Sequence, residues 1–373
     1  MLALAVVLSG CTQGGTHSAN GPATVASPLS PSVDGSASDS TSTHPTVSAA
    51  TSATSTSTSA SPSISQAQVT AAGASGTSTA TTRKQSTSTG VLASMSRPFP
   101  ATNAWNTSIA AKAVDPLSAA IIASIGSSTT LHMDFGANWN GGPFGIPYVV
   151  VPASQPKVRV TFDYASESDP GPYPIPGNAP IEGGASSTGD RHVIVVQPSS
   201  GKLYELYDAH PNADGSWHAG SGAIFNLTTG ADRPAGWTSA DAAGLPILPG
   251  LVRYDEVASG VINHAIRFTV ATTRKAYVYP ARHYASSNTS TSVPPMGARV
   301  RLRADFDISG YRQQARVILQ AMKTYGMIVA DNGSNWFVSG TPDSRWSDTQ
   351  LNTLKNVPGS AFDVVTLGTV TTG

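Results

Sequence analysis

The pattern of hydrophobic and polar positions after residue 95 is mostly that of short strands. Runs of β-branched, aromatic and other apolar residues are bounded by turns rich in Gly and Pro, which is typical of strands. We expect strands at residues 146–151, 158–164, 192–196, 203–207, 262–270, 276–279 and 300–306. The strands at 192–196 and 203–207 flank a Pro-Ser-Ser-Gly turn, so they predict a hairpin.

Helical periodicity is confined to a few segments. Residues 118–126 predict a short helix closed by glycine, and residues 313–325 predict one longer helix with a single apolar face. Residues 327–330 and 336–338 bracket a polar turn and predict a second hairpin, and Ser347 opens a capping box for a final helix. Many short strands, few helices and no strand–helix alternation predict a mainly β protein, an antiparallel β-sandwich or jelly roll with a few peripheral helices.

The composition divides the chain into three parts. Residues 11–95 are almost entirely Ser, Thr, Ala, Gly and Pro and contain no Trp, Tyr or Phe. Such a segment cannot bury enough apolar surface to offset the entropy of ordering, so it predicts a disordered tether. We therefore expect a signal peptide at 1–10, the tether at 11–95 and a single folded domain at 96–373.

The only cysteine, Cys11, follows a short apolar run that ends in Leu-Ser-Gly. The run is too short to cross a membrane as a permanent helix. The Leu-Ser-Gly-Cys sequence resembles the bacterial lipobox, although no Lys or Arg precedes the apolar run. The resemblance implies cleavage before Cys11, lipidation of that residue, and a protein anchored to the membrane of the cell envelope and facing outside the cytoplasm. The alternative is an ordinary secreted or buried cysteine.

Charge and cysteine content exclude several classes of function. The formal net charge is zero, whereas a nucleic-acid-binding protein needs a basic excess or a basic stripe. The closest candidates, Arg299, Arg301 and Arg303, alternate like a solvated face of one strand. We therefore expect no nucleic-acid partner. With Cys11 lipidated, the domain would have no thiol, no disulfide and no cysteine-ligated metal.

No specific catalytic motif is present. The domain lacks G-x-S-x-G, H-E-x-x-H, the P-loop pattern and a dinucleotide glycine fingerprint after a strand. Two connections are unusually long, residues 167–189 and residues 209–250. Because binding and catalysis often use long ordered loops on a rigid sheet, these two connections are the predicted site region.

The first candidate cluster lies on the predicted hairpin. Strand alternation places His192 on one face of its strand and Glu205 with Tyr207 on one face of the neighbouring strand, and Asp208 follows. A carboxylate on an apolar stripe would have a raised pKa suited to general acid catalysis. The alternative is that Glu205 pairs with an arginine on a polar sheet face.

A second cluster combines Arg253 and Glu256 with His264 and Arg267. His264 alternates in register with the apolar positions 262, 266 and 268, so it is either a general base or a satisfied core histidine. Arg267 faces the opposite way.

Other candidates are dispersed along the chain. Arg282, His283 and Tyr284 follow a predicted strand, and the long connection carries Trp217, Trp237 and Asp241. Residues 331–336 contain ordinary turn residues and need no function. No cofactor is expected, but calcium or another metal could bind through Asp208, Asn212 and Asp214 or through His210 and His218, although neither spacing matches a known metal-binding loop.

Residues 236–256 (GWTSADAAGLPILPGLVRYDE), Asn263-His264 and Ala281-Arg-His-Tyr284 together resemble an uncharacterised family of secreted bacterial proteins. The resemblance covers roughly residues 97–365. It implies a shared fold and export, and it supplies no activity or catalytic residues.

The leading hypothesis is an exported, lipid-anchored carbohydrate-active enzyme acting on an extracellular or envelope polysaccharide. A glycoside hydrolase would use two carboxylates, drawn from Glu205, Asp208, Asp241 and Glu256. A polysaccharide lyase would use His264, His283 or Tyr284 as the base, with Arg267 or Arg282 neutralising a uronate. The remaining polar and aromatic candidates would bind substrate: His192, Tyr207, Trp217, Trp237 and Arg253.

The competing hypothesis is a non-catalytic glycan-binding or structural surface lipoprotein. Such a protein needs aromatic platforms but no perturbed carboxylate pair. Scattering of the candidate acids and His264 over separate faces would count against the enzyme.

Overall fold

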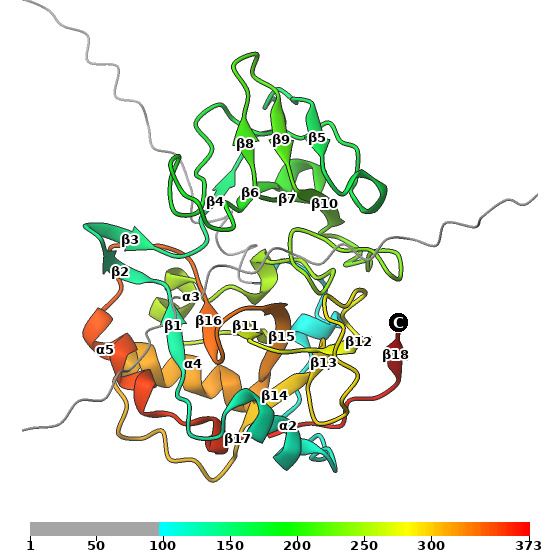
Figure 1. Ribbon diagram of the computed structural model, residues 1–373. Coiled ribbons are helices and arrows are strands. Elements are labelled where there is room, and N and C mark those ends of the chain that lie inside the picture. Colours follow the sequence, from blue (N-terminus) through cyan, green and yellow to red (C-terminus); the bar gives the residue numbers. More distant parts are fainter. Residues whose placement is uncertain (1–96) are drawn as a thin grey trace, which may run out of the picture. The chain divides into compact units, whose positions relative to one another are not determined.

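The structure is a computed structural model that describes residues 97–373 (Figure 1). The predicted signal peptide, Cys11 and the tether lie outside the described residues. No helix within 97–373 is long and apolar enough to span a membrane.

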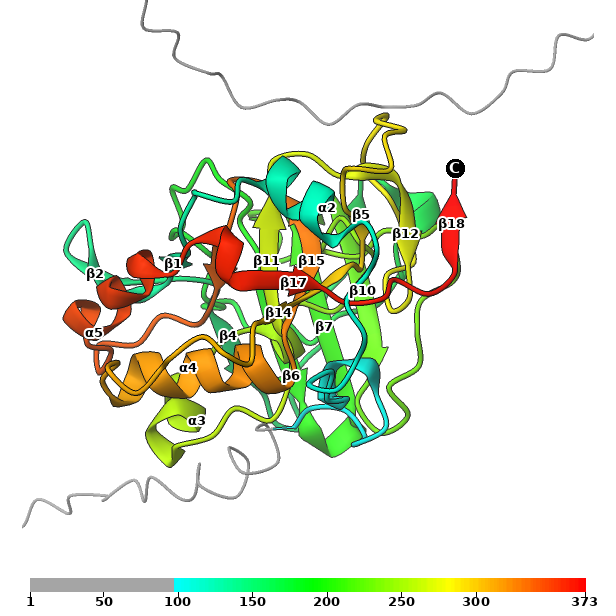
Figure 2. The same cartoon turned by 90° about the horizontal axis from the view of Figure 1, so that it is seen from below.

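A six-stranded mixed sheet forms the centre of the larger part of the fold. Its strand order is β1 (His132–Asp134), β16 (Phe337–Ser339), β11 (Ile266–Val270), β15 (Met327–Asn332), β14 (Arg299–Leu302) and β17 (Phe362–Val364). The helix α4 (Gln313–Thr324) packs on β14, with α3 (Tyr254–Ser259) and α5 (Asp348–Asn352) beside it, and α2 (Ser118–Ile125) packs on β17 (Figure 2).

The predicted helices agree with the structure. In α4 the apolar residues Val317, Ile318, Ala321 and Met322 are buried together, as a single apolar face requires. Gly326 follows α4 with a φ of 70°, a conformation in which glycine is favoured after a helix. The side chain of Ser347 accepts a hydrogen bond from the amide of Gln350, which confirms the N-cap of α5.

A second sheet has the order β10 (Ser221–Asn226), β7 (Lys202–Tyr207), β6 (Val193–Gln197) and β4 (Tyr148–Val150). The predicted hairpin is confirmed, because β6 and β7 pair antiparallel with Ile194 opposite Glu205. One face of the hairpin, with Ile194 and Leu203, packs into the main core. The other face, with Val195 and Leu206, packs into a smaller core under β5 (Val160–Phe162) and β9 (Trp217–Ala219). Burial of both faces explains the unbroken apolar run in β6.

The remaining strands form small peripheral sheets. β12 (Arg274–Val278) lies between β13 (Pro295–Met296) and β18 (Val370–Thr372), β8 (His210–Pro211) pairs with β9, and β2 (Gly136–Trp139) pairs with β3 (Gly142–Phe144). Short 3-10 turns complete the chain at Ala104–Asn106, Ala165–Glu167, Pro198–Ser200, Leu248–Gly250, Thr353–Asn356 and Gly359–Ala361.

The fold has more strand than helix, as expected, but its sheets are not purely antiparallel. Five pairs are parallel: β1 with β16, β4 with β6, β5 with β9, β11 with β15, and β12 with β13. The antiparallel prediction assumed that successive strands pair with one another. Here long irregular connections return the chain in the same direction, so strands that are distant in sequence become neighbours.

The predicted hairpin of 327–330 and 336–338 is wrong, because β11 lies between β15 and β16. The turn between these two strands is bonded to the end of β11. Thr269 donates from its hydroxyl to the carbonyl of Ser334, and the amide of Gly333 donates to the carbonyl of Val270. The turn residues were recognised correctly, but turn chemistry does not reveal a third strand inserted between the two arms.

Two other expectations are corrected. The segment 209–250 was predicted to be one long connection, yet β8, β9 and β10 occupy its first part. Arg299 and Arg301 do not form a solvated face. Their guanidinium groups donate to backbone carbonyls of the segment before α2, including those of Ala104 and Ile109, and so fasten that segment to β14.

Candidate functional site

A buried cluster of charged side chains lies where β11, β15 and β16 face the segment that follows β10. Arg267 on β11 is its centre and is only 3% exposed. Its Nη2 lies 2.9 Å from Oδ2 of Asp241, and its Nη1 donates to the hydroxyl of Ser339 over 2.7 Å. Ser339 is the last residue of β16. A fully buried arginine must be paired, and this one is paired on two sides.

Asp331 is the part of this cluster that reaches solvent. Its Oδ2 lies 3.7 Å from Nη2 of Arg267, and its side chain keeps 23% of its surface exposed. A register shift in the pairing of β11 with β15 places Thr269 opposite Asp331 rather than opposite Ala330. Burial and the charge of Asp241 raise the pKa of Asp331 to about 7.

Asp241 and Asp331 both lie beside Arg267, but their contacts with it differ. This difference decides which of the two carboxyl groups is protonated. Burial raises the pKa of Asp241 too, but Arg267 and the amide of Ala243 oppose that shift. Because Asp241 makes two charge-assisted bonds to the guanidinium, through Nε and Nη2, we assign it the charge and assign the proton to Asp331.

A second ion pair, His192 with Glu182, lies beside the first. Nδ1 of His192 is 2.5 Å from Oε2 of Glu182, and Nε2 is 3.0 Å from the carbonyl of Ala240. Both partners accept hydrogen bonds, so both ring nitrogens must carry protons. Burial by itself lowers the pKa of His192, but the charge of Glu182 outweighs it and raises the pKa to about 9. Burial likewise opposes ionisation of Glu182, yet His192 holds the pKa of Glu182 below its ordinary value.

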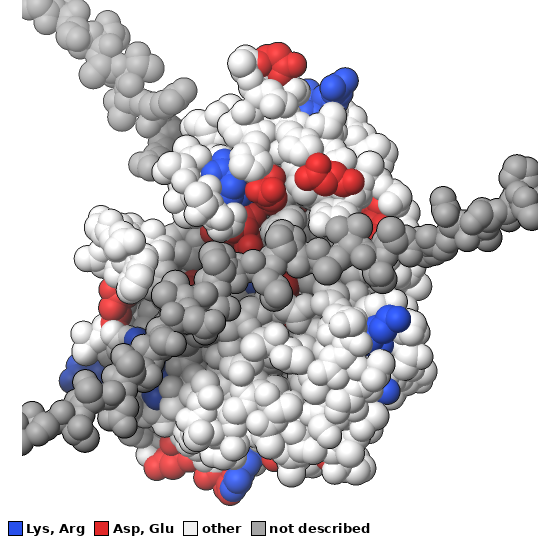
Figure 3. All heavy atoms as spheres, viewed as in Figure 1, with Lys and Arg blue, Asp and Glu red and all other residues white. Residues whose placement is uncertain are grey.

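Two more carboxylates, Asp134 and Asp190, border the cluster. Asp134 ends β1 opposite Ser339, and burial together with the charges of Glu182 and Asp190 raises its pKa. Figure 3 shows acidic atoms gathered in a hollow between the part of the fold built on β6 and β7 and the part built on the six-stranded sheet. We call Asp134, Glu182, Asp190 and Asp331, with Asp241 and Arg267 behind them, the acidic cleft.

Tyr207 also borders the acidic cleft. Its ring centroid is 6.0 Å from that of His192. Burial and the nearby carboxylates Asp190 and Asp208 raise its pKa to about 12. Tyr207 is therefore neutral at ordinary pH and can donate a hydrogen bond from its hydroxyl.

Glu205, the leading candidate from sequence, is fully buried behind the acidic cleft. It pairs with no arginine: its two carboxylate oxygens accept from the amides of Ile247 and Leu248 over 2.8 and 2.9 Å. Burial raises the pKa of Glu205 to about 7 even though these two bonds oppose the shift. These contacts fix the turn that follows Asp241, so Glu205 has a structural position.

Glu205→Ala should lower the free energy of unfolding by about 2 kcal/mol. An unsatisfied buried amide costs about 1–3 kcal/mol, and the variant leaves two of them, while removal of a desolvated acid offsets part of the loss. Urea denaturation of the full chain would measure the difference, with Asp214→Ala in an exposed turn as the control. An unchanged midpoint would show that the turn is held without Glu205.

Arg253, Glu256 and His264 form a separate buried trio. Nη2 of Arg253 lies 2.5 Å from Oε1 of Glu256, and Nε2 of His264 lies 3.2 Å from Oε2 of the same carboxylate. Arg253 also donates to the carbonyl of Leu248, whose amide is bound by Glu205. The turn Leu248–Gly250 is therefore held from both sides by buried charges, and none of the trio is exposed enough to meet a substrate.

The other residues predicted for the site lie apart from the acidic cleft. Asp208 pairs with His210 on an exposed edge, and Trp217 is buried in the smaller core. Trp237 lies against the guanidinium of Arg233, which pairs with Asp169.

The last three predicted residues, Arg282, His283 and Tyr284, mainly contact the surrounding backbone and one another. Nε of Arg282 donates to the carbonyl of Arg233, Nδ1 of His283 lies 2.8 Å from the carbonyl of Ala242, and the rings of His283 and Tyr284 stack with centroids 5.8 Å apart. Of the fourteen predicted site residues, Asp241 and Arg267 therefore belong to the acidic cleft, His192 and Tyr207 lie beside it, and Glu205 lies behind it.

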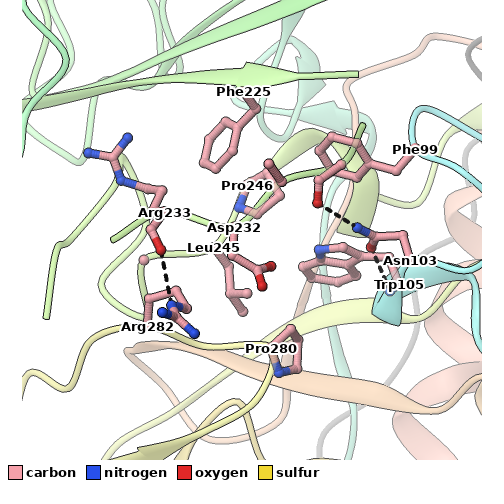
Figure 4. A pocket seen from close by; sticks show the side chains of 13 residues that line it. Phe99, Asn103, Trp105, Phe225, Asp232, Arg233, Leu245, Pro246, Pro280 and Arg282 are labelled. Atoms are coloured by element: carbon pink, nitrogen blue, oxygen red, sulfur yellow. Dashed lines mark hydrogen bonds between the residues drawn. The ribbon is translucent and has the colours of Figure 1, made fainter. Parts of the chain in front are cut away.

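A crevice beside Arg282 is too small to bind substrate. It is lined by Phe99, Trp105, Phe225, Asp232 and Pro246, among others (Figure 4), and its volume is about 10 Å³. That volume holds about one water molecule.

The described residues contain no group of three or more His, Cys, Asp and Glu that could hold a metal ion. The residues considered for calcium make hydrogen bonds within their own loop instead. Asp208 binds His210, while Asn212 and Asp214 both bind Ser216.

Sequence reasoning did not select Asp134, Asp190 or Asp331 as site residues. It did not name Glu182 either, although Glu182 lies in the connection 167–189 that was predicted to contain the site. Asp331 was dismissed as a turn residue, since the pattern gave no sign that it lies next to Arg267. Asp134 ends β1, a strand that the sequence pattern did not predict. No family model, curated protein or solved structure matches this chain, so the resemblance to secreted bacterial proteins stays a prediction.

Proposed function

We propose that this protein is a glycoside hydrolase, held at the cell envelope through lipidated Cys11, and that the acidic cleft is its active site. The observation that carries the proposal is a partly exposed carboxyl group with a pKa of about 7, Asp331, in the same cluster as the ionised carboxylate of Glu182. Glycosidases use two carboxyl groups in these opposite protonation states.

Asp331 is the general acid. A carboxylic acid with a pKa near the working pH is protonated in a useful fraction of molecules and donates readily to the oxygen of the leaving group. Its proton goes to the glycosidic oxygen as the bond to the anomeric carbon breaks. Arg267 holds Asp331 in place, while burial and the charge of Asp241 raise the pKa of Asp331 against the opposing charge of Arg267.

Glu182 is the second carboxylate. Both contacts of its carboxylate with His192 use Oε2, so Oε1 is not engaged by them. That oxygen either attacks the anomeric carbon or takes a proton from a water molecule that does so. The separation of the two carboxyl groups around a bound sugar decides between retention and inversion.

The contacts favour a hydrolase over a lyase. A lyase needs a free cation to neutralise a uronate and a free base. Arg267 is bound to Asp241 and Ser339, and His264 is buried against Glu256. The excess of carboxylates in the acidic cleft would also repel a polyanionic chain.

The test is the release of reducing ends from a panel of neutral and amino-sugar polysaccharides by the full chain, with absorbance near 235 nm followed in parallel. New reducing ends would support the proposal. A gain in absorbance near 235 nm that persists in Glu182→Gln would contradict the proposal and favour elimination.

A second candidate is a non-catalytic glycan-binding lipoprotein. It is favoured by the burial of the three acids Glu205, Asp241 and Glu256, none of which can touch a sugar as the fold stands. Retention of the protein on an insoluble glycan, with no reducing ends from any polymer, would support this candidate instead.

A further inference from the structure

The hairpin of β2 and β3 carries the most exposed large apolar side chain among residues 97–373. Trp139 is 67% exposed, whereas Trp105, Trp217, Trp336 and Trp346 are buried. It lies opposite Gly142 in the hairpin, so no side chain across the strand pair covers its ring. The nearest aromatic ring, that of Phe144, is 6.2 Å away at an angle of 49°.

The hairpin is anchored rather than loose. Oδ1 of Asp348, at the start of α5, accepts from the amide of Ala137 over 2.8 Å. Gly136 lies so close to Phe144 and Asp348 that a Cβ there would be 2.6 Å from each. The exposed indole is therefore presented by a fixed support, which lowers the entropic cost of binding a ligand.

The chemistry of the hairpin tip suits a neutral sugar. Trp139 is flanked by Asn138 and Asn140, and no charged residue occurs between Gly136 and Phe144. An indole face offers apolar contact, and the adjacent carboxamides offer hydrogen-bond donors and acceptors. Gly142 leaves the face open.

The hairpin continues directly from the acidic cleft. Asp134 ends β1 and Gly136 begins β2, so Trp139 follows Asp134 by five positions, which span at most about 17 Å. By its place in Figure 1, the hairpin borders the hollow that Figure 3 shows. A glycan a few sugar units long could therefore reach from the reacting bond to the indole.

We propose that Trp139 is the platform of an outer subsite, on which a neutral sugar unit of the polysaccharide stacks while another unit occupies the acidic cleft. This inference rests on the proposed hydrolase function. It makes Trp139 a residue that determines preference for long chains, without a part in bond cleavage. Binding energy at such a distance acts on KM for polymers and leaves short substrates unaffected.

The experiment compares wild type, Trp139→Ala and Trp139→Phe as full chains, with Tyr279→Ala as the matched control. Tyr279 is an aromatic residue with 59% exposure elsewhere on the fold. Kinetics are measured on the polysaccharide that the wild type hydrolyses and on a short aryl glycoside of the same sugar. Acrylamide quenching of tryptophan fluorescence with and without oligosaccharide reports directly on the exposed indole.

Trp139→Ala should raise KM for the polymer about tenfold and leave kcat/KM for the aryl glycoside unchanged, and Trp139→Phe should have an intermediate KM. Oligosaccharide should protect the wild type from quenching and neither variant, because both lack the indole that binds the sugar. Equal kinetics of Trp139→Ala and wild type on the polymer would overturn the inference and leave the hydrolase standing. Loss of binding to phosphatidylcholine vesicles in Trp139→Ala, with glycan kinetics intact, would also overturn it and indicate a membrane contact. A wild type that neither binds nor cleaves any glycan would remove the proposed function as well.

Discussion

Asp331→Asn should lower kcat on the cleaved polysaccharide by about 10²–10⁴-fold, the usual contribution of a positioned general acid. The carboxamide keeps the shape of the protonated acid but cannot give up its proton. In the wild type, kcat/KM should fall as the pH rises above about 7, because the group acts as an acid and burial raises its pKa to about 7. Reducing-end assays between pH 5 and 9 would measure both effects.

The fold should tolerate this change, because about half of the Asp331 side chains are protonated near pH 7 and an amide resembles that form. Asp305→Asn, in an exposed pair with Arg303, is the matched control and should leave the rate unchanged. If Asp331→Asn retained wild-type kcat and the descending limb of the pH profile, Asp331 could not be the acid. The acidic cleft would then need another proton donor, and Asp134 is the remaining candidate with a raised pKa.

Arg267→Met should lower the free energy of unfolding by about 3–5 kcal/mol, since it leaves one partner of a buried ion pair without the other. Asp241 has no exposed surface in its side chain, and Ser339 would also lose its donor. Urea denaturation of the full chain would measure the loss. The double variant Arg267→Met, Asp241→Leu should recover part of it, because no uncompensated charge is then buried.

Arg345→Met is the control for this prediction. Arg345 also contacts two carboxylates, Asp343 and Asp255, but it is 53% exposed. Exposed pairs contribute about 0–1 kcal/mol, so its loss should be small. Equal destabilisation by the two substitutions would mean that burial does not govern the strength of the Arg267 pairs.

Local features of the fold could be predicted because short-range physics decides them. The apolar face of α4, the cap formed by Ser347 and the β6–β7 hairpin each depend on residues within a few positions of one another. Their periodicity, capping chemistry and turn residues carry the information locally. Even the shared face of Ile194 and Glu205 follows from alternation along two strands.

The pairing of distant strands could not be predicted in this way. β11 is inserted between β15 and β16 although more than fifty residues separate it from either strand. Nothing in the turn between β15 and β16 reveals the insertion, because alternation fixes which side chains share a face but not which strand lies next to it.

For this protein the sequence by itself determined the strand-rich composition of the domain, its principal helix and hairpin, and the identity of several polar residues that end up buried. Only the tertiary structure decided which of these residues form a site. Glu205 and Asp331 have similar raised pKa values, yet one is bound by two backbone amides and the other borders solvent beside Arg267. Exposure and partners of a carboxyl group depend on segments far away in the chain, and those are settled only when the sheets pack.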